Sequence, residues 1–292
     1  MINYIILRTF APLRAYMVSK CGHNKPYIIK TNSIGAALVC LALVSCRDEV
    51  ILKLNTVGAI PVIECNISND SIPFHARITT TANYYSLIIP EVQDARVTIV
   101  GSDGSLDTLF HDSAGMYYSK AIHPCKIGIR YTLSVAYNGK TYTASEICRP
   151  QNPIDSLKMI IMPKRGFLPA GPYLWEWAQE KPGIGDSYQW NIYKNDTLLN
   201  EDFYFLNDDK LIDGAYLASD FPFLFKVGDN IVFEQMAISQ PLFNFLTTIQ
   251  SQINRDGSPF SSHPSNISGN MSGGALGFFA VRNLIRKRLT VK

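Results

Sequence analysis

Apolar and polar residues alternate with a period of two through most of the chain, and this pattern predicts strands with one buried face. In Phe74–Ala82, for example, Ala76 and Ile78 alternate with Arg77 and Thr79. Segments of this kind are separated by Asn, Asp, Gly and Pro, which favour turns. The strands predicted in this way are Ala59–Ser68, Phe74–Ala82, Val92–Val100, Ser105–Phe110, Tyr131–Tyr137, Lys140–Ala144, Lys158–Met162, Tyr173–Trp177, Tyr188–Tyr193, Phe203–Phe205, Tyr216–Leu217, Phe221–Phe225, Ile231–Ile238 and Ala275–Val281.

The clearest hairpin lies at Asn138-Gly139, because this pair supplies a positive φ at both turn positions. Short strands at this spacing, with turns between them, are typical of an antiparallel β-sandwich. We therefore predict a β-sandwich domain over residues 59–149. Pro150 and Pro153 then interrupt the pattern, and we place a domain boundary there.

The second domain, residues 150–292, is predicted to be β-rich with one amphipathic helix at about residues 240–254. Ser239 suits the N-cap of this helix, and Pro241 is tolerated in its first turn. Apolar residues then recur at helical spacing, so the helix should lie on the face of a sheet. The residues of this stripe are Leu242, Leu246, Ile249 and Ile253.

A continuous apolar run, Ile34–Val44, precedes the strands and ends two residues before Cys46. The run is shorter than the roughly 20 residues that cross a bilayer, and it follows lysines without any acidic residue. This arrangement predicts a signal peptide over residues 1–45, with Met17 as an alternative start. The competing interpretation is a buried core helix that ends at an ordinary cysteine.

Leu43, Val44 and Ser45 before the cysteine match the bacterial lipobox, which implies acylation of Cys46 and cleavage before it. Two or three acyl chains hold a protein on a membrane where one chain does not. We therefore expect an outer-membrane lipoprotein in which residues 46–58 form a lipidated tether.

The residues that follow the acylated cysteine bear on which side of the membrane the protein faces. Arg47, Asp48 and Glu49 resemble the basic-then-acidic signal that sends Bacteroidota lipoproteins to the cell surface. We expect the protein to face the cell surface, and the periplasmic face is the alternative.

Cleavage also changes the charge of the chain. Residues 1–45 contain five basic residues and no acidic residue, so their removal changes the net charge from +3 to −2. Such a chain lacks the clustered basic surface that nucleic acids need, and we expect no nucleic-acid partner. The basic cluster formed by Arg282, Arg286, Lys287 and Arg288 is interpreted as a solvated tail.

Three cysteines, Cys65, Cys125 and Cys148, remain in the mature chain besides Cys46. Since three is odd, at most one disulfide can form among them within the chain, and the sequence leaves open whether any two pair. Their spacing resembles no zinc site, and we expect neither a metal nor a cofactor.

Several short segments follow one another in a recognisable order, and the most specific of them is Gly273–Phe279. The other segments are the lipobox with Cys46, Pro61–Cys65, Thr81–Tyr85, Ala95–Ile99, Tyr131–Tyr142, Pro153–Ser156, Ser258–Phe260 and Pro264–Ile267. This order resembles the Bacteroidota lipoproteins called domain of unknown function 4249. The resemblance implies a first domain like the transthyretin or carboxypeptidase-regulatory sandwich, and a gene setting beside TonB-dependent receptors. It implies no catalytic residues.

The familiar catalytic motifs do not occur in the sequence. Gly-x-Ser-x-Gly, His-Glu-x-x-His, the P-loop and the dinucleotide fingerprint are all missing, so we expect a non-enzymatic protein. Paired carboxylates such as Asp208-Asp209 lie in loop-like sequence and are interpreted as solvated. Gly183-Ile184-Gly185 is interpreted as a turn.

The best candidates for ligand binding are Tyr173, Trp175 and Trp177, which alternate and would therefore share one face of a strand. Flat aromatic rings of this kind bind sugars in other proteins. Core packing is the competing interpretation, because aromatic side chains bury large areas, and it is also our prediction for Phe221, Phe223 and Phe225.

Two functions follow as hypotheses. The first is a non-enzymatic surface lipoprotein that assists a TonB-dependent receptor in nutrient uptake. The second is a carbohydrate- or peptide-binding module that acts alone.

Overall fold

The computed structural model describes residues 58–83, 86–253 and 267–292, which belong to one compact unit, Thr56–Lys292. Within this part the chain is mostly β-structured, as predicted. The predicted signal peptide, Cys46 and the export signal Arg47–Glu49 lie outside the described residues.

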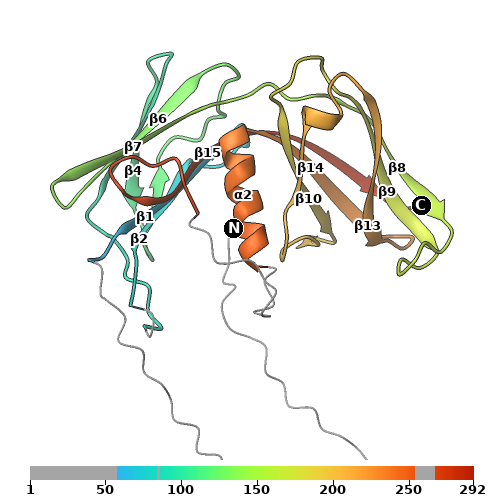
Figure 1. Cartoon of the computed structure of the whole chain (residues 1–292), viewed down its shortest axis with the longest axis horizontal. Coiled ribbons are helices and arrows are strands. Elements are labelled where there is room, and N and C mark those ends of the chain that lie inside the picture. Colours follow the sequence, from blue (N-terminus) through green and yellow to red (C-terminus); the bar gives the residue numbers. More distant parts are fainter. Residues whose placement is uncertain (1–57, 84–85, 254–266) are drawn as a thin grey trace, which may run out of the picture. The chain divides into compact units, whose positions relative to one another are not determined.

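The first seven strands form an antiparallel sheet that curls around one core, as predicted for a sandwich (Figure 1). Their spatial order is β1-β2-β5-β4-β3-β6-β7. Alternate residues of each strand point into the core, as Ile63, Cys65 and Ile67 do in β1. The strands are β1 (Pro61–Ser68), β2 (His75–Thr80), β3 (Arg96–Gly101), β4 (Leu106–His111), β5 (Met116–Ser119), β6 (Arg130–Tyr137) and β7 (Lys140–Ile147).

The predicted hairpin is confirmed between β6 and β7. Asn138 and Gly139 have φ angles of 48° and 71°, and Tyr137 pairs with Lys140 across the turn. In this half, only β5 has no counterpart among the predicted strands, because its four residues are too few to show an alternation of apolar and polar positions.

A single long strand, β15 (Leu276–Thr290), continues this sheet into the second half of the chain. Its first part pairs in parallel with β1, from Val62↔Leu276 to Ser68↔Arg282. Its second part pairs antiparallel with β14, from Ala237↔Asn283 to Asn230↔Thr290. The parallel pairing joins segments more than 200 residues apart, and no local pattern predicts it.

The second half places a three-stranded sheet, in the order β13-β9-β8, across a core from β10, β14 and β15. Phe221 and Phe225 are buried in this core, with Phe223 partly buried, so the prediction of core packing is confirmed. The strands are β8 (Ile154–Met162), β9 (Gly171–Gln179), β10 (Ser187–Lys194), β11 (Thr197–Leu198), β12 (Phe205–Asp208), β13 (Tyr216–Leu224) and β14 (Asn230–Ile238).

The predicted helix is α2 (Gln240–Ile253), and Ser239 caps it through a 3.2 Å hydrogen bond from the backbone N–H of Leu242 to its hydroxyl. Leu242 and Leu246 are buried against Phe278 and its neighbours on β14 and β15, so the stripe lies on the sheet face. Ile253, at the end of the stripe, is 54% exposed. Within the described residues, no helix has the length and apolar character needed to cross a membrane.

The interpretation of the C-terminal basic cluster as a solvated tail is wrong, because these residues belong to β15. Arg286 donates to both carboxylate oxygens of Asp70, at 3.1 and 2.6 Å, and to Glu234 at 2.8 Å. Arg282 donates to Asn66 of β1 and, at 3.3 Å, to Gln189 of β10. Both side chains therefore join the two halves of the chain, whereas Lys287 and Arg288 are exposed.

The backbone of β15 passes β1 so closely that a side chain is not tolerated at Gly277. This residue has a φ of +99°, and a methyl group on its Cα would overlap the carbonyl oxygen of Ile63. Gly274 has a similar φ of +80° but faces open space.

We predict that Gly277→Ala lowers the free energy of unfolding by about 2–5 kcal/mol, because backbone strain adds to overlap with β1. Gly274→Ala is the matched control and should cost about 1–2 kcal/mol from strain alone. Urea denaturation followed by tryptophan fluorescence measures both. Equal losses of stability in the two variants would show that the close approach of β15 to β1 adds no cost to a side chain at position 277.

Candidate functional site

The predicted aromatic residues lie on β9, the central strand of the three-stranded sheet. The rings of Trp175 and Trp177 stack on one face of it, with centroids 5.8 Å apart and planes 26° from parallel. Both side chains are partly exposed. The strand therefore presents a short aromatic surface, which we call the tryptophan face and define as Trp175 and Trp177.

Tyr173, the third predicted residue, shares this side of β9 but is only 1% exposed. Its hydroxyl donates to the carbonyl oxygen of Pro169 at 2.7 Å, and the guanidinium of Arg165 lies 5.6 Å from its ring centre. The structure thus brings two of the three predicted side chains to the surface and packs the third beneath the adjoining loop.

Charged residues flank the tryptophan face on both neighbouring strands. Lys158 of β8 and Asp220 of β13 are the register partners of Trp175. The Lys158 ammonium lies 5.8 Å from the ring centre of Trp177, and Asp220 accepts a hydrogen bond from Arg165 at 2.5 Å. Aromatic surface with a few polar groups beside it is the usual composition of a small-ligand site.

The opposite side of β9 faces a buried polar cavity of about 30 Å³. Glu176, between the two tryptophans in sequence, points to this side and is 3% exposed. The cavity has room for about two water molecules, since one needs roughly 10–15 Å³. Its lining residues include Asn152, Glu176, Glu180, Tyr188, Trp190 and Gln235.

Three side chains at this cavity form a closed hydrogen-bond triangle. The amide of Asn152 donates to Glu180 at 2.8 Å and to the Tyr188 hydroxyl at 2.6 Å, and that hydroxyl donates to the other oxygen of Glu180 at 2.8 Å. Burial raises the pKa of Glu180, and the hydrogen bonds that Glu180 accepts from Tyr188 and Asn152 oppose that effect. The triangle therefore fixes one carboxylate at the edge of the cavity.

Fewer hydrogen bonds compensate the burial of the Glu176 carboxyl group. The indole N–H of Trp190 donates to one of its oxygens at 3.1 Å, and the other oxygen has no hydrogen-bond partner among the described residues. Burial consequently raises the pKa of Glu176 to about 7. This carboxyl group is therefore half protonated near neutral pH.

A second acidic group adjoins Glu180. Asp209, at the start of the 3₁₀ helix η1 (Asp209–Leu211), is completely buried, which makes our interpretation of it as a solvated loop residue wrong. One of its oxygens accepts the backbone N–H groups of Gly185 and Asp186, at 2.6 and 2.8 Å. The end of the predicted turn at Gly183-Ile184-Gly185 thus donates hydrogen bonds to the buried carboxylate of Asp209.

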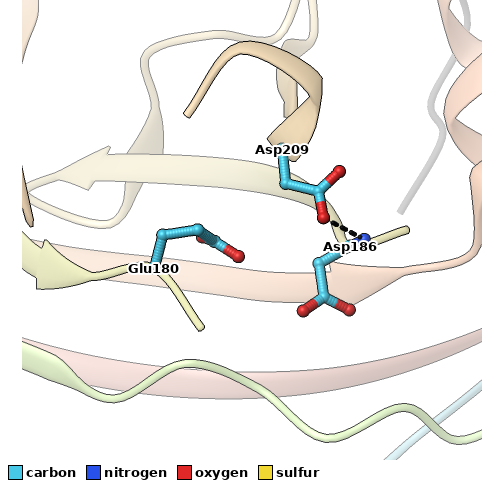
Figure 2. A group of neighbouring side chains, drawn as sticks. All are labelled: Glu180, Asp186 and Asp209. Carbon is cyan, nitrogen blue, oxygen red and sulfur yellow. Dashed lines mark hydrogen bonds between the residues drawn. The ribbon is translucent and has the colours of Figure 1, made fainter. Parts of the chain in front are cut away.

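Figure 2 shows how Glu180, Asp186 and Asp209 approach one another from three segments of the chain. Their ligand oxygens lie within 4.8 Å of one another. Two oxygens bound to one Ca²⁺ can be separated by up to about 5 Å, so this donor set has the spacing to hold a hard cation. It can alternatively retain a proton, because burial and the charge of Asp209 raise the pKa of Asp186.

The size of the cavity limits what these acids can do. Pockets for organic ligands have volumes of roughly 300–1,000 Å³, about ten times the volume beside Glu176. Two carboxyl groups with raised pKa values could otherwise indicate a glycosidase. The cavity accommodates waters or a single ion, and a sugar ring does not fit.

The sequence pattern does not predict this acidic site. Glu176 alternates with the tryptophans, so its direction follows from the strand period, but the acids of the cluster come from separate loops. The other predicted site residues, Cys46, Arg47, Asp48 and Glu49, lie outside the described residues, and their roles remain predictions.

We predict that Glu176 makes the protein less stable as the pH rises. Its pKa is about 7 in the folded state and 4.5 when the carboxyl group is fully solvated, so the folded state binds the proton more tightly between these values. About 3 kcal/mol of the stability present below about pH 4.5 is therefore lost progressively as the pH rises to about 7, and little more is lost above it.

Denaturation of wild type and Glu176→Gln at about pH 5 and about pH 8 measures this contribution. The variant should lose less stability than wild type on going to the higher pH, and the exposed control Glu201→Gln should behave as wild type. A fall in stability of the same size in Glu176→Gln would contradict the assignment.

Comparison with known proteins places this chain in a family. Residues 48–288 match the model described as "Domain of unknown function (DUF4249)". No curated protein matches the chain. A two-domain fibronectin type III segment of chicken tenascin matches 80% of this chain and 99% of its own, at 12% identity and a TM-score of 0.23, which is too low to support an argument. Because the family model spans most of the sequence, the protein belongs to the domain of unknown function family DUF4249.

Proposed function

We propose that the protein is a non-enzymatic outer-membrane lipoprotein that assists a TonB-dependent receptor in nutrient uptake. One contrast carries the proposal. Glu176 and Glu180 line a cavity of about 30 Å³, too little for an organic substrate, whereas the stacked rings of Trp175 and Trp177 lie on an accessible sheet face. The arrangement favours binding of a ligand at the surface over its chemical conversion.

The anchoring part of the proposal rests on the lipobox and on the place where the tether joins the folded chain. Residues 46–57 span at most about 40 Å when extended. They lead to Ile60, whose carbonyl oxygen accepts the N–H of Thr81 at 2.9 Å. The fold therefore begins within a short reach of the acyl chains.

An apolar loop follows this point of entry. Leu87, Ile88 and Ile89 are 89%, 77% and 51% exposed, and they lie a few residues beyond Thr81. Three consecutive exposed aliphatic residues are unusual on a solvated surface and mark a contact site. This surface is suited to contact the apolar surface of another protein, and we propose the receptor as that partner.

We predict that the full chain, purified from outer membranes in mild detergent, brings a TonB-dependent receptor with it. Leu87→Asp combined with Ile88→Asp should reduce the recovered receptor about tenfold or more, because charges replace the apolar contact. Ile184→Asp, at a residue that is 70% exposed elsewhere, is the matched control.

Quantitative mass spectrometry of the eluates measures the receptor in this experiment. Cys46→Ala, which cannot be acylated, should leave the membrane fraction altogether. Recovery of the wild-type protein without any such receptor would count against the accessory role.

The second candidate is a carbohydrate- or peptide-binding module that acts alone, and the tryptophan face is the observation that favours it. We predict that Trp175→Ala and Trp177→Ala each weaken binding to glycans or peptides by about tenfold to a hundredfold, since buried aromatic contacts dominate such interfaces.

Glycan and peptide arrays, followed by calorimetry on the best ligand, test this prediction. Phe167→Ala removes a fully exposed ring at 106% relative exposure in the β8–β9 loop and serves as the control. Binding that is unchanged in both tryptophan variants would exclude the tryptophan face. Binding by the purified protein without a receptor would favour the stand-alone module.

A further inference from the structure

Two of the three mature-chain cysteines whose pairing the sequence left open meet in the core of the first half. Cys125 lies in the loop between β5 and β6, and Cys148 follows β7. Their sulfur atoms are 2.7 Å apart, and the residues are 4% and 0% exposed. The structure holds both as free thiols.

Backbone hydrogen bonds keep the two residues in place. The N–H of Cys125 donates to Ser68 at 2.9 Å, and the N–H of Cys148 donates to Ile129 at 3.0 Å. The carbonyl oxygen of Cys148 accepts from Gly128 at 2.8 Å. Cys125 is therefore bonded to the end of β1, and Cys148 to the loop that carries Cys125, so the proximity of the sulfurs is built into the fold.

We infer that Cys125 and Cys148 form a disulfide bond in the exported protein. A disulfide joins sulfurs at about 2.05 Å, so a small movement of two side chains is enough. The third cysteine, Cys65, is also completely buried, in β1, and burial raises the pKa of its thiol. It is the cysteine that stays reduced.

The bond forms by thiol–disulfide exchange with a small-molecule or protein disulfide as the oxidant. Because the thiolate is the attacking species, whichever of the two cysteines is exposed and deprotonated first starts the reaction. It attacks the oxidant, forms a mixed disulfide and releases one thiolate.

The second exchange completes the reaction. The other cysteine loses its proton to solvent and attacks the protein sulfur of the mixed disulfide, which releases the second thiolate. Overall, two protein thiols and one external disulfide give one protein disulfide and two external thiols. Because both sulfurs are buried, exchange takes place while the chain folds or opens locally.

The bond would secure the place where β15 leaves the first half. Cys125 Sγ lies 3.7 Å from the carbonyl oxygen of Arg282, the last residue of β15 that pairs with β1. Its backbone is bonded to Ser68 at the end of β1, and Cys148 follows β7. A link between Cys125 and Cys148 also reduces the conformational freedom of the unfolded chain, which stabilises the folded state.

The test refolds the full chain from denaturant with oxidised and reduced glutathione, blocks free thiols with an alkylating reagent and maps tryptic peptides. Residues 121–126 should appear joined to residues 141–158, which carry Cys148, and Cys65 should be alkylated. Alkylated Cys125 and Cys148, or a link from Cys65 to either, would overturn the inference.

A stability measurement provides the matched control. The urea midpoint of the oxidised protein should fall on reduction, and it should also fall in Cys65→Ala. In Cys125→Ala combined with Cys148→Ala, the midpoint should not respond to reductant. A midpoint that ignores reductant in the wild type would contradict the inference.

The inference rests on the proposed export only for the supply of oxidant. A third experiment tests the cysteine pairing and the export separately. Cells that express the full chain are quenched in acid, alkylated and mapped in the same way. A disulfide in both the refolded and the cellular protein supports the pairing and the export. A disulfide in the refolded protein alone supports the pairing and counts against an oxidising compartment.

Discussion

The strand β15 is the constraint on which the rest of the structure depends, because it alone joins the two halves of the 12-stranded sheet. Its first half pairs with β1 and places Phe279 and Val281 in the first core, and its second half pairs with β14 and leads to Val291 in the second core. Gly277 is required where β15 meets β1, since any side chain there would overlap the backbone of Ile63.

Polar side chains reinforce this junction. Arg286 pairs with Asp70 from the first half and Glu234 from the second, and both carboxylates are mostly shielded from solvent. Removing one partner of such a group leaves a poorly compensated charge, so these contacts bind the halves together even though each ion pair also carries a desolvation cost. The proposed disulfide would act at the same place, since Cys125 contacts the backbone of Arg282.

The two faces of β9 separate the surface chemistry from the buried chemistry. Its outer face carries the tryptophans, and its inner face carries Glu176, whose pKa is near 7. Two backbone N–H groups donate to one oxygen of Asp209, and Asn152 and Tyr188 donate to the two oxygens of Glu180, whereas Glu176 receives one indole hydrogen bond.

The sequence by itself determined most of the strands, the Asn138-Gly139 hairpin, the capped helix and the direction of each side chain along β9. These features depend on periods of two or 3.6 residues and on local turn and capping chemistry. Tertiary structure alone decided the parallel pairing of β1 with β15, the burial of Asp209, the role of Arg282 and Arg286, and the meeting of Cys125 with Cys148. Each of these brings together residues that are distant in sequence, and their burial and pairing depend on neighbours that no local pattern specifies.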